Sequence, residues 1–231
     1  LNAWYSSSFD KYIFLTEQMN EVVNPKGHPH IVMEALCDSS LANDVENTNV
    51  KKSHPRIVMY AGGLYEKYGL KMLAEGFIAA NVEDAKLVYY GEGSYVEEYK
   101  KLCERHSNLE YRGIVPTETV VADELKASLL VNPRFTTEEF TKYSFPSKNM
   151  EFMASGTPLL TTKLPGMPTE YYQYVYMFEK ETVEGYAEAI RKALSHTENE
   201  LRLFGYNAKQ FVLLNKNNVH QGIRVLQFLN K

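Results

Sequence analysis

Short apolar runs alternate with segments of helical periodicity through the middle of this 231-residue sequence. In the segment 69–80, for example, Leu70, Leu73 and Phe77 recur at the spacing of one helix face. Strands that alternate with helices of this length indicate βαβ units and a parallel sheet. The sequence therefore predicts an α/β fold, a doubly wound parallel-sheet domain that runs from about residue 52 to residue 195.

The same pattern gives the expected elements in order. The expected strands cover residues 57–61, 86–90, 109–111, 128–132, 158–162 and 175–178. The expected helices cover residues 69–80, 94–106, 117–126, 147–154 and 182–194, and Thr117 is placed to cap one of them. Beyond these, residues 198–229 predict two or three helices, broken near Gly205 and Asn217.

The first 50 residues do not fit this unit. Two short runs, 12–15 and 30–33, predict strands, and the turn-rich stretch 24–29 separates them. Residues 43–53 are polar and are expected to form a linker. We expect this part to be an edge element or the tail of a preceding domain. The chain opens at Leu1 rather than at a methionine, from which we expect a fragment or a processed chain.

Composition disfavours several classes of protein. The 25 basic residues are outnumbered by 29 acidic ones, which gives a net charge of −4 and no sign of non-specific nucleic-acid binding. The two cysteines, Cys37 and Cys103, lie far apart, so neither a disulfide scaffold nor a zinc ribbon is expected, and a reducing, cytoplasmic compartment is favoured. No apolar run reaches the roughly 20 residues of a membrane span, and the first residues lack the pattern of a signal peptide.

The expected topology also places a ligand site. In a doubly wound sheet of order 3-2-1-4-5-6, ligands bind beyond the carboxyl ends of the strands, between the first and the fourth. The segments that follow those two strands offer glycines and two helix N-termini. They also carry the side chains of Lys67, Arg134, Ser147 and Lys148. Backbone N–H groups, a helix dipole and cations together favour an anion, so the residues predict a phosphorylated ligand.

Plainer interpretations exist for each part of this pattern. Gly62 and Gly63 also suit a tight turn, Lys67 also suits a solvated helix start, and Ser147 also suits an N-cap. The first turn reads GGLYEKYG rather than GxGxxG, and no GxxxxGK[ST] loop occurs, so an NAD enzyme and a P-loop NTPase are disfavoured. The six histidines form no ligand cluster and no Asp-rich motif occurs, so no metal is expected.

A series of short motifs runs through residues 55–195. In order, the motifs are YAGGL at 60–64, KYGL at 67–70, YGEG at 90–93, YRGIV at 111–115, NPR at 132–134 and FPSKNMEFMASGTP at 145–158. The series resembles the C-terminal, donor-binding domain of GT-B glycosyltransferases, especially family-4 enzymes of bacterial polysaccharide synthesis, and the PSKxxExMASGxP block is its most specific part.

The resemblance implies a division of the chain. Residues 52–195 correspond to the Rossmann-like, nucleotide-sugar-binding domain. Residues 1–51 correspond to the remnant of the N-terminal domain and the interdomain linker. Residues 196–231 correspond to C-terminal helices that pack back toward the N-terminal domain.

The resemblance also implies roles for individual residues. Lys67 matches the basic residue that contacts the diphosphate, and Glu151 matches the glutamate that hydrogen-bonds the ribose. Gly63 stands where the family often has an arginine, for which Arg134 or Lys148 could substitute. The segment 145–148 matches backbone amides that hold the diphosphate. The expected donor-binding residues are Gly62, Gly63, Lys67, Ile114, Arg134, Tyr143, Phe145, Ser147, Lys148 and Glu151.

The resemblance also bears on the base and on the donor sugar, through Ile114 and Tyr143. Ile114, within the stretch 113–115, matches the main-chain pocket for the base. Tyr143 stands at the first position of the family's paired glutamates, eight residues before Glu151, so the usual contact to the donor sugar is changed here.

The function implied by the resemblance is transfer of a hexose from a UDP- or GDP-sugar to a glycan or lipid-linked acceptor in polysaccharide biosynthesis. Retention of configuration is implied, with no metal or other cofactor. Breaking the sugar–phosphate bond puts charge on a nucleoside diphosphate, which Lys67, Lys148 and the helix start at Ser147 would stabilise. Because GT-B enzymes have a second domain, we expect this chain to be the donor-binding part only. Catalytic residues and any membrane association would then involve the absent half.

Two other functions stay open. Some nucleotide-sugar 2-epimerases share the GT-B architecture, although the PSKxxExMASG block argues against that function. The second is a non-catalytic nucleotide-sugar-binding module, which the departures at Gly63 and Tyr143 favour.

Overall fold

A six-stranded parallel sheet forms the centre of the protein, whose computed structural model describes residues 8–40 and 50–231. Most of the expected linker 43–53 therefore lies outside the described residues. The strand order β5-β4-β3-β6-β7-β8, counted from β3, is the expected order 3-2-1-4-5-6. The strands are β3 (Arg56–Ala61), β4 (Ala85–Tyr90), β5 (Leu109–Gly113), β6 (Leu129–Asn132), β7 (Leu159–Thr162) and β8 (Tyr176–Phe178).

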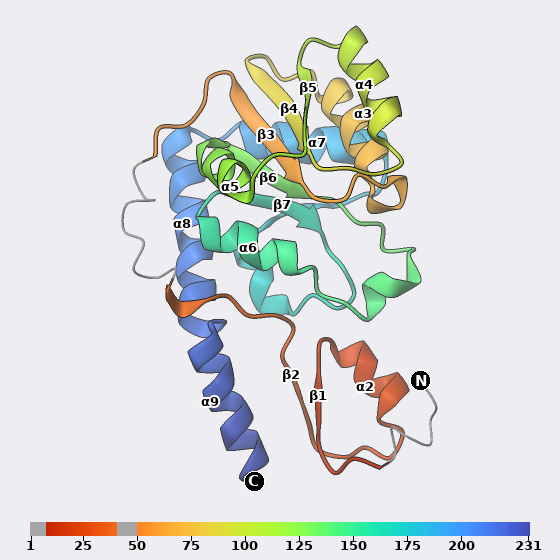
Figure 1. Ribbon diagram of the computed structural model, residues 1–231, viewed down its shortest axis with the longest axis vertical. Helices are drawn as coiled ribbons and strands as arrows, with labels where there is room; N and C mark the ends of the chain where they lie inside the picture. Colours follow the sequence, from red (N-terminus) through yellow and green to blue (C-terminus); the bar gives the residue numbers. More distant parts are fainter. Residues whose placement is uncertain (1–7, 41–49) are drawn as a thin grey trace.

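Helices cover both faces of this sheet (Figure 1). One face carries α3 (Leu70–Ala80), α4 (Val96–Arg105) and α7 (Val183–Leu194), and the other carries α5 (Thr117–Lys126), α6 (Ser147–Ser155) and α8 (Glu198–Asn215). Short 3-10 turns follow three of the strands: η3 (Glu66–Tyr68), η4 (Glu139–Lys142) and η5 (Thr169–Tyr174). The α/β, doubly wound fold expected from the sequence is confirmed.

The strands are buried on both sides because a helix layer covers each side. In β3, Val58 and Tyr60 pack toward the first helix layer, whereas Ile57 and Met59 pack toward the second. All neighbouring strands run parallel, so their carboxyl ends meet at one edge of the sheet. The loops at this edge are the place where such a fold leaves polar groups free for a ligand.

A smaller unit lies below the sheet domain in Figure 1, beside the last helix. Its elements are β1 (Tyr12–Phe14), α2 (Glu17–Val23) and β2 (His30–Val32), and the last helix is α9 (Asn218–Leu229). The two strands are parallel neighbours. The expected strands 12–15 and 30–33 are thus present, each one residue shorter than predicted.

Basic side chains connect the smaller unit to α9. The Lys11 ammonium donates hydrogen bonds to the carbonyl oxygens of Phe228 and Leu229 at 3.1 and 2.9 Å. The Arg224 guanidinium donates one to the carbonyl oxygen of Val32 at 3.1 Å. A cation at the C-terminal end of a helix satisfies carbonyl groups that have no partner within the helix, so these contacts stabilise α9 as well as the unit.

A buried ion pair joins the smaller unit to the sheet domain. The Lys216 ammonium, just after α8, lies 2.7 Å from a carboxylate oxygen of Glu34, and the two side chains are 6% and 2% exposed. Lys216 also lies 2.6 Å from Glu170, and the Tyr171 hydroxyl donates a hydrogen bond to Glu34. Because a buried charge is costly without its partner, this contact fixes the path of the chain between the two units.

Helix α8 corrects one expectation about the C-terminal region. It runs without a break through Gly205, where the sequence predicted an interruption. A Cβ on Gly205 would lie 2.1 Å from the carbonyl oxygen of Gly156, so glycine is needed there for α8 to lie directly on the end of α6. The expected break near Asn217 is confirmed, because the Asn217 side chain accepts the His220 N–H at 2.8 Å and caps α9.

A proline occupies the N-cap position of both α5 and α6, and a residue with a hydroxyl group follows it. Pro116 and Pro146 hold the N-cap positions with extended ψ angles of 143° and 114°. Thr117 and Ser147 are therefore the first helical residues, and the expectation that Thr117 caps its helix was wrong, as was the plainer N-cap interpretation of Ser147. A side chain at the first helical position points away from the N–H groups that a cap would satisfy.

The contact between α6 and α8 leads to a stability prediction. Gly205→Ala should lower the free energy of unfolding by about 2 kcal/mol or more, because the new methyl group would push α8 away from α6. Gly222→Ala is the matched control, since a Cβ on Gly222 in α9 would meet nothing within 4 Å. That substitution should raise the free energy of unfolding by about 0.5–1 kcal/mol. Urea unfolding followed by circular dichroism measures both, and equal effects would contradict the close contact.

Candidate functional site

A hollow of about 160 Å³ lies at the carboxyl edge of the sheet. Four of the expected donor-binding residues line it: Gly62, Ile114, Lys148 and Glu151. They come from the loops after β3 and β5 and from the first turns of α6. Typical small-molecule pockets measure roughly 300–1,000 Å³, so this hollow suits one part of a larger ligand.

The floor of the hollow is a close contact between the loops after β3 and β4. Gly91 has φ +118°, and a Cβ there would lie 1.9 Å from the carbonyl oxygen of Gly62, so only glycine fits. The Gly62 N–H donates to the carbonyl oxygen of Tyr90 at 3.1 Å, and the Gly91 N–H donates to that of Gly113 at 2.8 Å. Three loop backbones are thereby held side by side at the floor.

Helix α6 begins at this hollow. The first N–H groups of a helix have no acceptor within it, and the Pro146 side chain supplies none at this N-terminus. The helix dipole adds a partial positive charge at the same place. Lys148, in the first turn, lines the hollow and adds a full positive charge. The start of α6 is therefore suited to an anion.

A buried hydrogen-bond network fixes this helix start on the sheet. The Asn132 amide donates to the side-chain oxygen of Asn149 at 2.6 Å, and the Asn149 amide donates to the Thr161 hydroxyl at 3.3 Å. The Thr161 hydroxyl in turn donates to the carbonyl oxygen of Asn132 at 2.9 Å. Asn132 and Thr161 are 0% exposed and Asn149 is 1% exposed. Because buried polar groups lose free energy when unpaired, the network holds α6 in one position relative to β6 and β7.

Lys148 and Glu151 form an ion pair one turn apart at the rim of the hollow. The ammonium lies 2.9 Å from a carboxylate oxygen, and the two side chains are 31% and 47% exposed. Ile114, also on the rim, is 70% exposed. The pair offers a cation for a phosphate and a carboxylate that can accept hydrogen bonds from hydroxyl groups, both within reach of solvent.

Two other expected cations meet at a second place, around Tyr68. The Arg134 guanidinium lies 3.6 Å from the centre of the Tyr68 ring, and the Lys67 ammonium lies 5.6 Å from it. The backbone N–H of Arg134 donates a hydrogen bond to the Thr162 hydroxyl at 3.1 Å. The loops after β3 and β6 thus approach each other as the topology predicted, but Lys67 and Arg134 do not line the hollow itself.

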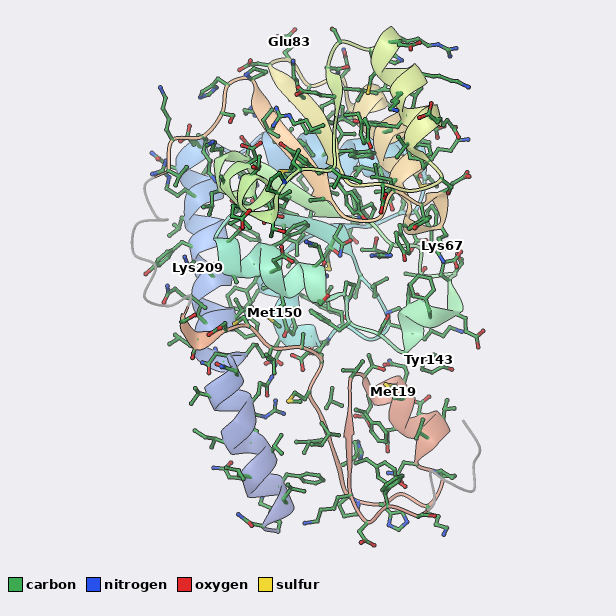
Figure 2. The ribbon with its side chains drawn as sticks, viewed as in Figure 1. Met19, Lys67, Glu83, Tyr143, Met150 and Lys209 are labelled. Carbon is green, nitrogen blue, oxygen red and sulfur yellow. The ribbon has the colours of Figure 1, made fainter. Side chains whose placement is uncertain are left out.

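The remaining expected residues lie outside the hollow. Phe145 is 6% exposed and packs in the core, so only its backbone is available to a ligand. Gly63 follows β3, and its carbonyl oxygen accepts a hydrogen bond from Tyr60 at 3.0 Å. Ser147 lines a neighbouring hollow between α5 and α6. Tyr143 directly follows η4, and Figure 2 shows it on the same side of the molecule as Lys67.

Sequence reasoning missed part of the rim. Arg112 donates to the Tyr90 hydroxyl and to Asp123, each at 2.9 Å, and the Tyr90 hydroxyl also donates to Asp123. This group ties β4, β5 and α5 together beside the hollow and keeps the Arg112 guanidinium occupied. The place of Gly91 directly after a strand could have indicated its role in the floor. No local sequence pattern pairs Arg112 with Asp123.

A buried carboxyl group lies behind the rim. Glu124, on α5, is 1% exposed, and within the described part of the chain one of its oxygens has no hydrogen-bond partner. Burial, and to a lesser extent the charge of Glu151, raises the pKa of Glu124 to about 7, and the charge of Lys148 opposes the shift. Glu124 also lines the hollow of about 280 Å³ between α5 and α6. Its protonation is thus coupled to the ion pair at the rim.

Two features, a metal-ligand cluster and a membrane-spanning helix, are absent from the described residues. These residues contain no group of three or more His, Cys, Asp or Glu side chains placed to hold a metal ion. None of the helices in residues 8–40 and 50–231 is both long and apolar enough to cross a bilayer.

Comparison with known proteins points to one family. The family model described as "Glycosyl transferases group 1" matches residues 55–196, which is more than half of the chain. No curated protein matches the sequence.

Solved structures share the fold over nearly the whole chain. Sucrose-phosphate synthase from Thermosynechococcus elongatus has a TM-score of 0.75 at 16% identity, over 99% of this chain and 59% of that one. The pneumococcal O-GlcNAc transferase GtfA, solved with UDP and GlcNAc, has 0.68 at 17%, over 99% and 47%. Anabaena HepE, solved with UDP, has 0.74 at 13%, over 96% and 64%. At these identities the likeness shows the fold alone, and this chain spans between half and two thirds of most of these proteins.

The raised pKa of Glu124 leads to a pH prediction. Between about pH 4.5 and pH 7 the folded protein keeps a proton on Glu124 that the unfolded chain releases, so this group lowers the free energy of unfolding as the pH rises. Glu124→Gln removes that contribution. Relative to the wild type, the variant should gain about 3 kcal/mol of stability between the two ends of this range.

Urea unfolding of both proteins at pH 4.5, 6 and 8 measures this difference. Glu118→Gln is the matched control, because Glu118 lies on the exposed side of the same helix. A difference between Glu124→Gln and the wild type that does not change with pH would show that Glu124 is not buried as described.

Proposed function

Because the chain belongs to the group 1 glycosyl transferases, we propose that it binds the nucleotide-sugar donor and stabilises the leaving nucleoside diphosphate. Its fold is that of the donor-binding half of GT-B enzymes, as the motifs predicted. The observation that carries the proposal is the hollow at the strand ends. There Lys148, Glu151 and the N-terminus of α6 meet the backbone of Gly113 and Ile114.

The contacts suggest how the donor lies. We assign the base to the backbone around Ile114, because main-chain groups there border the hollow and the floor keeps side chains out. The ribose hydroxyls would donate to the Glu151 carboxylate. The diphosphate would take the N–H groups at the start of α6 and the Lys148 ammonium. The three parts of a nucleotide thus match three kinds of group at the hollow.

The chemistry follows from this placement. Glycosyl transfer breaks the bond between the anomeric carbon and the diphosphate oxygen, and the electron pair stays on the diphosphate. The acceptor oxygen forms the new bond to the anomeric carbon, and its proton passes to the departing diphosphate or to a base. Lys148 and the α6 N–H groups stabilise the charge as it develops on the leaving group, and their positions are fixed before the reaction begins.

Lys67 and Arg134 supply a second cationic contact. We assign them to the phosphate nearest the transferred sugar, because their loops follow β3 and β6 at the same edge of the sheet. Arg134 then takes the place of the arginine that this sequence lacks at Gly63. Tyr143, where the family usually has a glutamate for the sugar, would offer a hydroxyl and a ring face instead.

The wider reaction rests on the family and on its structural neighbours. We propose a hexose donor, retention of configuration and a glycan or lipid-linked acceptor. Two of the neighbours were solved with UDP, which favours UDP over GDP as the nucleotide. This chain covers about half the length of its neighbours, and we assign the acceptor site and the remaining catalytic groups to the part that they have in addition.

A non-catalytic binding module is the second candidate function. Gly63 and Tyr143 favour it, because both stand where the family places a charged contact to the donor. Such a module would still bind the nucleotide, so binding and transfer must be measured separately.

Calorimetric titration of this chain with UDP and with GDP tests the proposal. We expect saturable binding of UDP, weakened about tenfold or more in Lys148→Ala, since a hydrogen bond to a charged group contributes about 1.5–3 kcal/mol. Lys101→Ala is the matched control, because Lys101 is exposed on α4 and lines none of the hollows described. Unchanged binding in Lys148→Ala, or no binding of either nucleotide to the wild type, would contradict the assignment.

A further inference from the structure

A larger hollow lies away from the strand ends, between α8 and the C-terminal ends of α5 and α6. Its volume is about 470 Å³. Three cationic side chains line it: Lys52, Arg202 and Lys209. None of the three lines the hollow assigned to the nucleotide. The two hollows share no lining residue, although the hollow between α5 and α6 shares residues with each of them.

Lys209 is the least expected of these residues. It lies in α8, is 6% exposed, and its side chain lines the hollow. Its aliphatic stem lies against Gly156, where an added Cβ would come within 3.3 Å of the Lys209 Cδ. Across residues 8–40 and 50–231, no hydrogen-bond acceptor or carboxylate partners the Lys209 ammonium. The described residues thus leave the Lys209 ammonium without a partner, where it can meet an anion in the hollow.

The other two cations are more fully engaged but leave the hollow positive. The Lys52 ammonium donates to the carbonyl oxygens of Leu125 and Ala127 at 2.9 and 2.8 Å and to the Thr157 hydroxyl at 3.2 Å. Burial, and to a lesser extent the charge of Arg202, lowers the pKa of Lys52 to about 8, and the charge of Glu198 opposes this shift. Lys52 thus adds positive charge at the edge of the hollow, with its three N–H groups already bonded within the protein.

Arg202 has one acidic partner. Its guanidinium lies 3.0 Å from a carboxylate oxygen of Glu198, and its Nε is buried without a partner in the described part of the chain. Among the described residues no acidic side chain lines the hollow, and Glu198, outside the lining, is the carboxylate that faces Arg202 and Lys52. An anion in the hollow would balance the three cations.

The rest of the lining is apolar or carries hydroxyl groups. Leu125, Leu203 and Tyr206 border the hollow, and Leu203 and Tyr206 are 62% and 44% exposed. Ser155 and Thr157 bring hydroxyl groups to the side where Lys52 lies. A ligand that matches this lining has a charged oxyanion at one end and a compact apolar group at the other.

We propose that this hollow binds a small phosphomonoester, with its phosphate on Lys209 and Arg202, near the charge of Lys52, and its apolar group against Leu203 and Tyr206. A phosphate dianion suits three cations and one carboxylate better than a singly charged anion does. Its oxygens would accept hydrogen bonds from the Lys209 ammonium and from the Arg202 Nε, which has no partner in the described part of the chain. The volume of about 470 Å³ is within the range of small-molecule sites and leaves room for the apolar group.

Calorimetric titration of this chain with phenyl phosphate and with inorganic phosphate tests the proposal. Phenyl phosphate should bind saturably, and more tightly than inorganic phosphate, because only the ester fills the apolar side. Lys209→Met keeps the buried stem and removes the charge, and it should weaken phenyl phosphate binding about tenfold or more. Arg202→Gln, on the more exposed side of the hollow, should weaken it in the same direction and serves if Lys209→Met does not fold.

Lys148→Ala separates this site from the nucleotide site. Phenyl phosphate binding should be unchanged in that variant and in Lys101→Ala. The proposal is overturned if the wild type shows no saturable binding of phenyl phosphate, or if Lys148→Ala weakens binding as much as Lys209→Met. Inorganic phosphate that binds as tightly as phenyl phosphate would overturn the assignment of an ester. Each result is independent of whether UDP binds at the strand ends.

Discussion

The hydrogen-bonded group of Asn132, Asn149 and Thr161 lies where β6, α6 and β7 meet, and it is shielded from solvent. Polar groups that are shielded from solvent cannot form hydrogen bonds to water instead, so they keep one arrangement or lose several hydrogen bonds together. That arrangement sets the direction of α6. The N-terminus of α6 then reaches the strand ends with Lys148 and Glu151, and its C-terminus meets α8 at Gly156 and Gly205.

The sheet and most of its helices could be predicted because their signals are local. Buried parallel strands are continuous apolar runs, and the helices between them repeat at 3.6 residues. The break predicted at Gly205 was wrong because a glycine within a helical pattern can indicate either a helix end or a close contact with another helix. Only the packing of Gly205 on Gly156 decides between these two interpretations. The order of the strands followed from the general rules of such folds rather than from any residue.

The candidate site could be predicted only in part. Lys148 and Glu151 stand in a specific motif on one helix, so their meeting follows from helix geometry. Lys67 and Arg134 were expected in the same crevice, yet both lie against Tyr68. The contact of Arg134 with Tyr68 joins two loops that are far apart in the sequence. The Lys216–Glu34 ion pair and the Arg112 group depend on such distant contacts too, and neither leaves a trace in local sequence.

The ion pair between Lys148 and Glu151 has a consequence for ligand selection. In the proposed complex the diphosphate binds Lys148 and the ribose binds Glu151. Each of the two side chains therefore exchanges its partner in the ion pair for a part of the ligand in one binding event. Pyrophosphate alone or a nucleoside alone would separate the pair while replacing only one of its two halves. A partly exposed pair contributes about 0.3–1 kcal/mol, which is a factor of about two to five in affinity. The ion pair is thus a weak internal competitor that an intact nucleotide displaces most readily.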